Sequence, residues 1–173
     1  MTVRSHVIWL LVLVAAVAFA PGRSVAGTLP PPTGPVLLKV FGAIDNTTDG
    51  TSAQFDRAAL EALGMHKITT TNPFVVGVHT FEGVRLTDLL ARVGAHGRIL
   101  KAHALDDFSP DIPIEDAKRY GVVLALKWDG KAIPVRGKGP IWMIYPADSY
   151  SDTDSAKISA RMVWQLQTLT VVP

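Results

Sequence analysis

The pattern of hydrophobic and polar positions along the chain predicts a domain made mainly of strands. Runs of β-branched and apolar residues bounded by turn residues are typical of strands. Such runs occur at 36–42, 66–71, 98–105, 122–128, 140–146 and 162–172. Asp129 and Gly130 follow the fourth run and predict a hairpin into 131–135. Many strands with only two or three short helices indicate an α+β, mainly β fold class.

Short helices are predicted at three places between these runs. In 55–64, Asp56 is placed as the N-cap and Gly64 as the terminating residue. A second helix is expected from 86 to 93, and a third, very short, at 114–120.

The connections between these elements are predicted from their turn residues. Gly83 indicates a tight turn before the second helix, and Gly94 indicates its end. The Val- and Gly-rich residues 75–78 are expected to form a loop, and the polar segment 147–159 is expected to be a connection between strands.

The first 26 residues have the features of a secretory signal peptide. Arg4 precedes an apolar run at 7–20, and small residues lie before Gly27. We expect cleavage after Ala26, an extended lead-in at 27–35 and a folded domain at 36–173, with no stable membrane span in the periplasmic or secreted product. Retention of the apolar run as a membrane anchor is the alternative.

Charge and cysteine content narrow the classes of function. The expected cleavage removes Arg4 and Arg23 and no acidic residue, so the remaining 15 basic residues balance the 15 acidic ones. A neutral domain has no long-range field to gather nucleic acid, so no nucleic-acid partner is expected. The chain has no cysteine. It therefore has no disulfide and no thiolate for metal, redox or nucleophilic chemistry.

Candidate motifs for catalysis or metal binding are weak when each is taken alone. The four histidines of the domain lack the spacing of metal ligands, and no GxSxG motif is present. Asp106 and Asp107 suit either a cation site or a solvated turn. The glycine-bearing basic segment 135–140 lacks the helix start of a strong phosphate site. The aromatic residues of the domain suit either an apolar pocket or ordinary core packing. They are Phe74, Trp128, Trp142, Tyr145, Tyr150 and Trp164.

Three stretches together give the chain a family resemblance. They are TFEGVRLTDLLARVGA at 80–95, VVLALKWDGKAIPVRGKGPIWMIYP at 122–146 and SARMVWQLQTLTV at 159–171. In this order they resemble the molybdopterin-binding domain of the sulfite oxidase family, and above all its short, stand-alone exported members. The resemblance covers most of 36–172 and implies the mixed β fold of that family.

The resemblance also implies which residues occupy the site positions. Enzymes of the family bind molybdenum through a cysteine thiolate, and the matching position here is Thr70, with Thr71 as the alternative. A protonated hydroxyl is a poor substitute for a soft thiolate. In the enzymes of the family, two cationic residues hold the pterin phosphate, and the matching positions here are Trp142 and Trp164. The resemblance thus implies that apolar surface has replaced positive charge at both positions.

We therefore expect an exported domain that has lost molybdopterin and molybdenum and acts as a non-catalytic, sensory module for a small ligand or a membrane or periplasmic partner. The leader lacks a twin-arginine motif, which agrees with export without a cofactor. A molybdopterin-dependent oxidoreductase with a non-cysteine metal environment is the alternative. The candidate pocket comprises Thr70, Thr71, Asn72, Asp107, Arg136, Lys138, Trp142, Arg161 and Trp164, with no catalytic residue and no metal ligand assigned.

Overall fold

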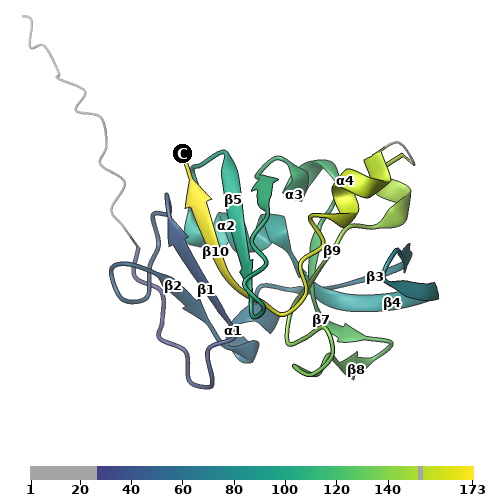
Figure 1. The fold of residues 1–173 in the computed structure, drawn as a ribbon. Helices are drawn as coiled ribbons and strands as arrows, with labels where there is room; N and C mark the ends of the chain where they lie inside the picture. Colours follow the sequence, from purple (N-terminus) through teal and green to yellow (C-terminus); the bar gives the residue numbers. More distant parts are fainter. Residues whose placement is uncertain (1–26, 152–153) are drawn as a thin grey trace, which may run out of the picture.

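The strands of the protein form two five-stranded sheets, which Figure 1 shows at the left and at the right of the molecule. The computed structural model describes residues 27–151 and 154–173. The predicted signal peptide at 1–26 lies outside the described residues. The sequence-based prediction of an α+β, mainly β fold is confirmed.

The first sheet has the strand order β2-β1-β10-β5-β6. Strands β1 and β10, from opposite ends of the domain, are parallel neighbours, and the other pairs are antiparallel. The sheet therefore cannot form until most of the chain is present. Its strands are β1 (Leu38–Gly42), β2 (Ala53–Phe55), β5 (Ile99–Ala104), β6 (Asp111–Pro113) and β10 (Leu166–Val172).

The second sheet has the order β3-β4-β7-β8, and β9 pairs with β7. The long hairpin of β3 and β4 forms one edge. Asp129 and Gly130 both have positive φ angles of 48° and 76°, as the predicted Asp-Gly hairpin between β7 and β8 requires. Its strands are β3 (Met65–Asn72), β4 (Val75–Arg85), β7 (Val123–Trp128), β8 (Lys131–Ala132) and β9 (Trp142–Ile144).

The helices are short, and their ends follow the capping residues in the sequence. The Asp56 carboxylate accepts a hydrogen bond of 2.8 Å from the Ala59 amide at the start of α1. Gly94 ends α2 in the left-handed conformation. In the described part of the chain, no helix has the length and apolar character needed to cross a bilayer. The helices are α1 (Arg57–Glu61), α2 (Leu86–Val93), α3 (Asp116–Arg119), α4 (Ser155–Ser159) and the 3-10 helix η1 (Ala147–Ser149).

Several predicted connections are wrong. Gly83 lies inside β4 instead of in a turn, and it pairs with β7. Glycine is needed there because a side chain would collide with the Leu124 carbonyl of β7. Residues 75–78 belong to β4 instead of a loop, since they pair with the end of β3. The polar segment 147–159 connects two strands, β9 and β10, as expected, but it contains the helices η1 and α4, and β10 begins at Leu166 instead of Met162.

Two hydrophobic clusters hold these elements together. The first draws on both sheets and on all four α-helices. The second is small and lies on the second sheet, against which Trp164 packs from outside. Its buried members are Phe81, Ala125, Ile133, Trp142 and Ile144.

Candidate functional site

Thr70, the predicted counterpart of a metal-binding cysteine, uses its hydroxyl to brace the fold. The side chain is buried near the end of β3. Its Oγ1 accepts a hydrogen bond of 2.7 Å from the Ala147 amide and donates one of 3.0 Å to the Thr71 carbonyl. The single hydroxyl proton and one lone pair are thus committed to backbone partners. The neighbouring Thr71 is exposed.

Asn72 shapes the turn that joins β3 to β4. Its Oδ1 accepts a hydrogen bond of 2.9 Å from the Phe74 amide, which is the geometry of an Asx turn. Its Nδ2 donates a weak bond of 3.6 Å to the Met162 sulfur. The buried amide therefore links the hairpin to the segment that precedes β10 and fixes the position of Phe74.

Three aromatic rings surround the ammonium group of Lys138. Its Nζ lies 4.0 Å from the ring centroid of Trp164, 5.0 Å from that of Trp142 and 5.5 Å from that of Phe74. These are cation–π distances. Burial lowers the pKa of the ammonium below its ordinary value. The cation is held by rings of the protein itself instead of being presented to an anion.

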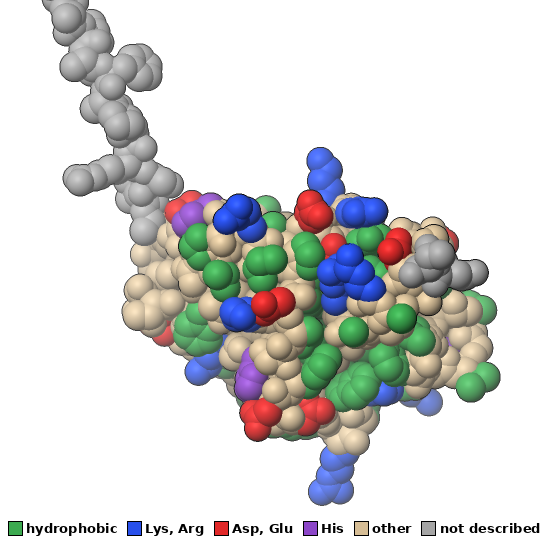
Figure 2. Space-filling view, turned by 45° about the horizontal axis from the view of Figure 1, so that its top comes forward, with side chains coloured by type: hydrophobic (Ala, Val, Ile, Leu, Met, Phe, Trp, Pro, Cys, Tyr) green, Lys and Arg blue, Asp and Glu red, His purple; other side chains and the backbone are tan. Residues whose placement is uncertain are grey.

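An apolar cavity of about 360 Å³ opens beside these rings and is called the Trp164 pocket below. Phe74 and Trp164 meet edge to face, with centroids 5.1 Å apart. Hydrophobic side chains gather on the lower right of the face shown in Figure 2, and Phe74 and Phe108 are among the exposed hydrophobic residues of the protein. The Trp164 pocket is lined by Phe74, Phe108, Ser159, Ala160, Met162 and Trp164.

Arg161 is turned away from this pocket into an ion pair in the interior. Its Nη1 donates to Asp116 Oδ2 at 2.6 Å, and the Tyr145 hydroxyl donates to the same oxygen at 3.1 Å. Only 3% of the Asp116 side chain and 13% of the Arg161 side chain are exposed. Burial, with the Asp116 charge beside it, raises the pKa of Tyr145 far above its ordinary value. Arg161, which was predicted to line the candidate pocket, is therefore held by the buried Asp116 carboxylate instead.

Two further predicted residues lie on the surface. Arg136 is exposed and has no ion pair with any residue in 27–151 or 154–173. The Asp107 side chain is 92% exposed and has His103 Nε2 at 3.5 Å. The structure therefore brings Lys138, Trp142 and Trp164 together, with Asn72 linked to them through Phe74. Thr70 bonds Ala147, Arg161 is paired with Asp116, and Thr71, Asp107 and Arg136 are exposed.

Phe108, Ala160 and Met162 line the pocket although sequence reasoning did not select them. Phe108 follows the two aspartates in the loop after β5, and Met162 follows the unpredicted helix α4. Phe108 is an apolar residue within a polar loop, and this contrast was a signal in the sequence. The other residues that line the pocket come from distant parts of the chain, so no local pattern predicts them.

His79 forms a second polar arrangement on the outer part of the β3–β4 hairpin. Its Nδ1 lies 2.7 Å from Asp129 Oδ2, and its Nε2 lies 2.9 Å from the Val76 carbonyl. Both ring nitrogens face acceptors, and only the imidazolium can donate from both. The bond to Asp129 and then the bond to Val76 raise the pKa of His79. No group of three or more His, Asp or Glu side chains placed to hold a metal occurs among the described residues.

Comparisons with known proteins agree on the architecture. The family model described as oxidoreductase molybdopterin binding domain matches residues 38–162. A search of the curated proteins found no match. Among solved structures, the sulfane dehydrogenase SoxCD from Paracoccus pantotrophus is similar, with a TM-score of 0.59 and 17% sequence identity. The match covers 78% of this chain and 37% of that chain, so the likeness concerns the fold.

Proposed function

Because the chain belongs to the oxidoreductase molybdopterin-binding domain family, we propose that it is an exported member that has lost molybdopterin and molybdenum. In this proposal the domain is a non-catalytic, sensory module that binds a small apolar ligand or signals to a periplasmic or membrane partner. The observation that carries the proposal is the commitment of the Thr70 hydroxyl to two backbone groups.

The donor set around Thr70 does not fit the cofactor of the family. A hydroxyl that already bonds Ala147 offers molybdenum no soft anionic ligand. Neither Lys138 nor Arg161 is free for a pterin phosphate, since Lys138 lies among rings and Arg161 is paired with Asp116. A buried phosphate without such partners is costly. No step of a molybdenum-dependent reaction is therefore assigned to this chain.

The Trp164 pocket supports the binding function. Ligand pockets are concave, mainly apolar and lined by aromatic side chains. The cavity of about 360 Å³ has these properties, and the Phe74 and Trp164 rings on its wall meet edge to face. Its lining contains one polar side chain, Ser159, whose hydroxyl already donates to the Ser155 carbonyl. The pocket therefore suits a small apolar or aromatic molecule.

Metal and pterin analysis of the protein purified from its native compartment tests the loss of the cofactor. We expect no stoichiometric molybdenum and no pterin in a folded protein. One molybdenum and one pterin per chain would overturn the proposal and favour the alternative, an oxidoreductase with a non-cysteine metal environment. The N-terminus of the same sample tests export, since processing after Ala26 would leave Gly27 as the first residue.

Binding of indole, followed by NMR chemical shifts, tests the pocket. Ala160→Trp fills the cavity and is expected to abolish the shifts at Met162 and Trp164. Ala156→Trp, four residues earlier in helix α4, is the matched control, since Ala156 is exposed and does not line the pocket. Shifts that persist in Ala160→Trp would place the indole elsewhere and remove the support for a ligand in this pocket.

A further inference from the structure

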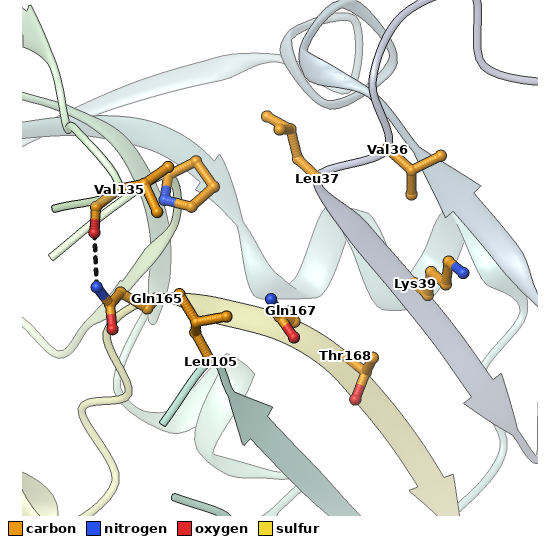
Figure 3. A pocket seen from close by; sticks show the side chains of 9 residues that line it. Val36, Leu37, Lys39, Leu105, Val135, Gln165, Gln167 and Thr168 are labelled. Atoms are coloured by element: carbon orange, nitrogen blue, oxygen red, sulfur yellow. Dashed lines mark hydrogen bonds between the residues drawn. The ribbon is translucent and has the colours of Figure 1, made fainter. Parts of the chain in front are cut away.

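A second hollow lies on the outer face of the first sheet and is lined by other residues than the Trp164 pocket. Figure 3 shows it between β1, β10 and the loops after β5 and β8. Its cavity measures about 460 Å³. Leu105 and Val135 at its rim are each about half exposed, at 50% and 51%. This groove is lined by Val36, Leu37, Lys39, Leu105, Val135, Pro140, Gln165, Gln167 and Thr168.

Gln165 holds two surface loops on opposite sides of the groove. Its carbonyl accepts a hydrogen bond of 3.0 Å from the Leu105 amide, and its own amide donates one of 3.0 Å to the Lys138 carbonyl. The side-chain Nε2 donates to the Val135 carbonyl at 2.6 Å, as Figure 3 shows. The loop that carries Leu105 and the loop that carries Val135 are therefore fixed relative to one another.

The charges on these loops have opposite signs. Asp106 and Asp107 follow Leu105 and are exposed, and Arg136 follows Val135 and is exposed. Lys39 lies in the groove itself. Within the described parts of the chain, neither Lys39 nor Arg136 has an acidic partner. An apolar centre is thus bordered by two exposed acids on one side, of which Asp107 has His103 as a neighbour, and by two bases without an acidic partner among the described residues on the other.

We propose that this face joins two copies of the chain about a two-fold axis. Leu105 of each copy enters the apolar groove of the other, and Asp106 and Asp107 meet Lys39 and Arg136 across the axis. A two-fold interface uses the same patch twice, so a patch with an apolar centre and both charge signs is complementary to itself. The apolar centre provides affinity, and the charges fix the register. This inference does not depend on the proposed function.

Sedimentation equilibrium of the full protein over a range of concentrations tests the interface. We expect a dimer in reversible equilibrium with the monomer. The acid variant Asp106→Lys/Asp107→Lys and the base variant Lys39→Glu/Arg136→Glu place like charges together, which weakens each homodimer by about 100-fold. An equal mixture of the two variants is expected to form a heterodimer, since the charges are again opposite.

Val76→Lys is the control, because Val76 is 99% exposed and lies outside the groove. We expect this variant to dimerise as the parent protein does. A parent protein that is monomeric at all concentrations would overturn the proposal. Charge variants that still dimerise, or a mixture that stays monomeric while circular dichroism shows folded chains, would overturn it equally.

Discussion

The first hydrophobic cluster is extensive and mostly aliphatic, whereas the second has only five buried members and is dominated by Phe81 and Trp142. Next to the first cluster, the buried Asp116 carboxylate accepts hydrogen bonds from Arg161 and Tyr145. In the second, the buried Trp142 Nε1 has no hydrogen-bond partner among the described residues. Unpaired buried donors are costly, so the aromatic side of the molecule is less completely optimised for stability.

The same contrast appears at the surface. The aromatic side carries the Trp164 pocket and the hairpin residues Val76 and Val78, which are 99% and 65% exposed. The comparison teaches that the first cluster maintains the fold and that the proposed small ligand is to be sought where the aromatic residues gather.

Trp142→Ala gives the largest expected effect and tests whether the small cluster still matters for stability. It removes a fully buried indole, and we expect the free energy of unfolding to fall by about 3–5 kcal/mol in urea denaturation. Trp142→Phe keeps a ring and removes the unpaired donor, so it should retain most of the stability. Equal losses in the two variants would contradict the expectation that a smaller ring without the unpaired donor retains most of the stability.

Arg161→Ala tests the polar network beside the first cluster. It leaves the Asp116 carboxylate buried without its cation, and we expect a loss of about 3 kcal/mol in the free energy of unfolding. Adding Asp116→Asn should recover part of that loss, because the unpaired charge is then gone. Lys157→Ala, an exposed change on α4, is the control and should stay within about 0.5 kcal/mol. An Arg161→Ala loss no larger than that of the control would contradict the network.

Thr70→Val tests the brace between the second sheet and η1. The change keeps the shape of the side chain and leaves the Ala147 amide without its acceptor, so we expect a loss of about 1–2 kcal/mol in urea denaturation. Thr71→Val is the matched control, since Thr71 is exposed and should change stability by less than about 0.5 kcal/mol. Equal effects at the two positions would show that the bond to Ala147 contributes nothing.

His79 gives the smallest expected effect, and it depends on pH. The folded protein raises the pKa of His79 above its ordinary value. Its contribution to stability is therefore fully present below pH about 6.5 and is lost as the pH rises through the folded pKa. The stability difference between the parent protein and His79→Phe should be larger at low than at high pH in urea denaturation.

Asp129→Asn provides a second variant for this titration. It removes the carboxylate that faces Nδ1 and should abolish most of the pH dependence. The imidazole titration, followed by NMR, should shift to lower pH in the same variant. A pH dependence of stability that is unchanged in Asp129→Asn would show that another group is responsible.

Local sequence signals predicted much of the fold. Asp56, Gly94 and the Asp129-Gly130 pair each act through their own backbone conformation or immediate neighbours, and all three are found where they were expected. The prediction of a turn at Gly83 was wrong. Glycine is required at this position by the close approach of β7, which lies about forty residues further along the chain. The short strands β2 and β6 were missed because three residues carry too little periodicity.

The candidate site could be predicted only in part. The positions around Thr70 came from a family pattern, and the structure brings Asn72, Lys138 and Trp164 into one region. The partner of Arg161 could not be predicted, because Asp116 lies 45 residues away on the short helix expected at 114–120, and nothing in that segment indicates its partner. Side-chain pairing at such separation depends on the completed fold.

The hydrogen bond between Thr70 and Ala147 also affects the order in which substitutions can accumulate over generations. A thiol is a weak hydrogen-bond acceptor. A Thr70→Cys change alone would therefore weaken the hydrogen bond that anchors η1. The protein would lose stability before any bound metal could restore it. A chain with a sulfur ligand at this position would need another acceptor for the Ala147 amide. The hydrogen bond that stabilises the present protein thus opposes the introduction of a thiolate at position 70.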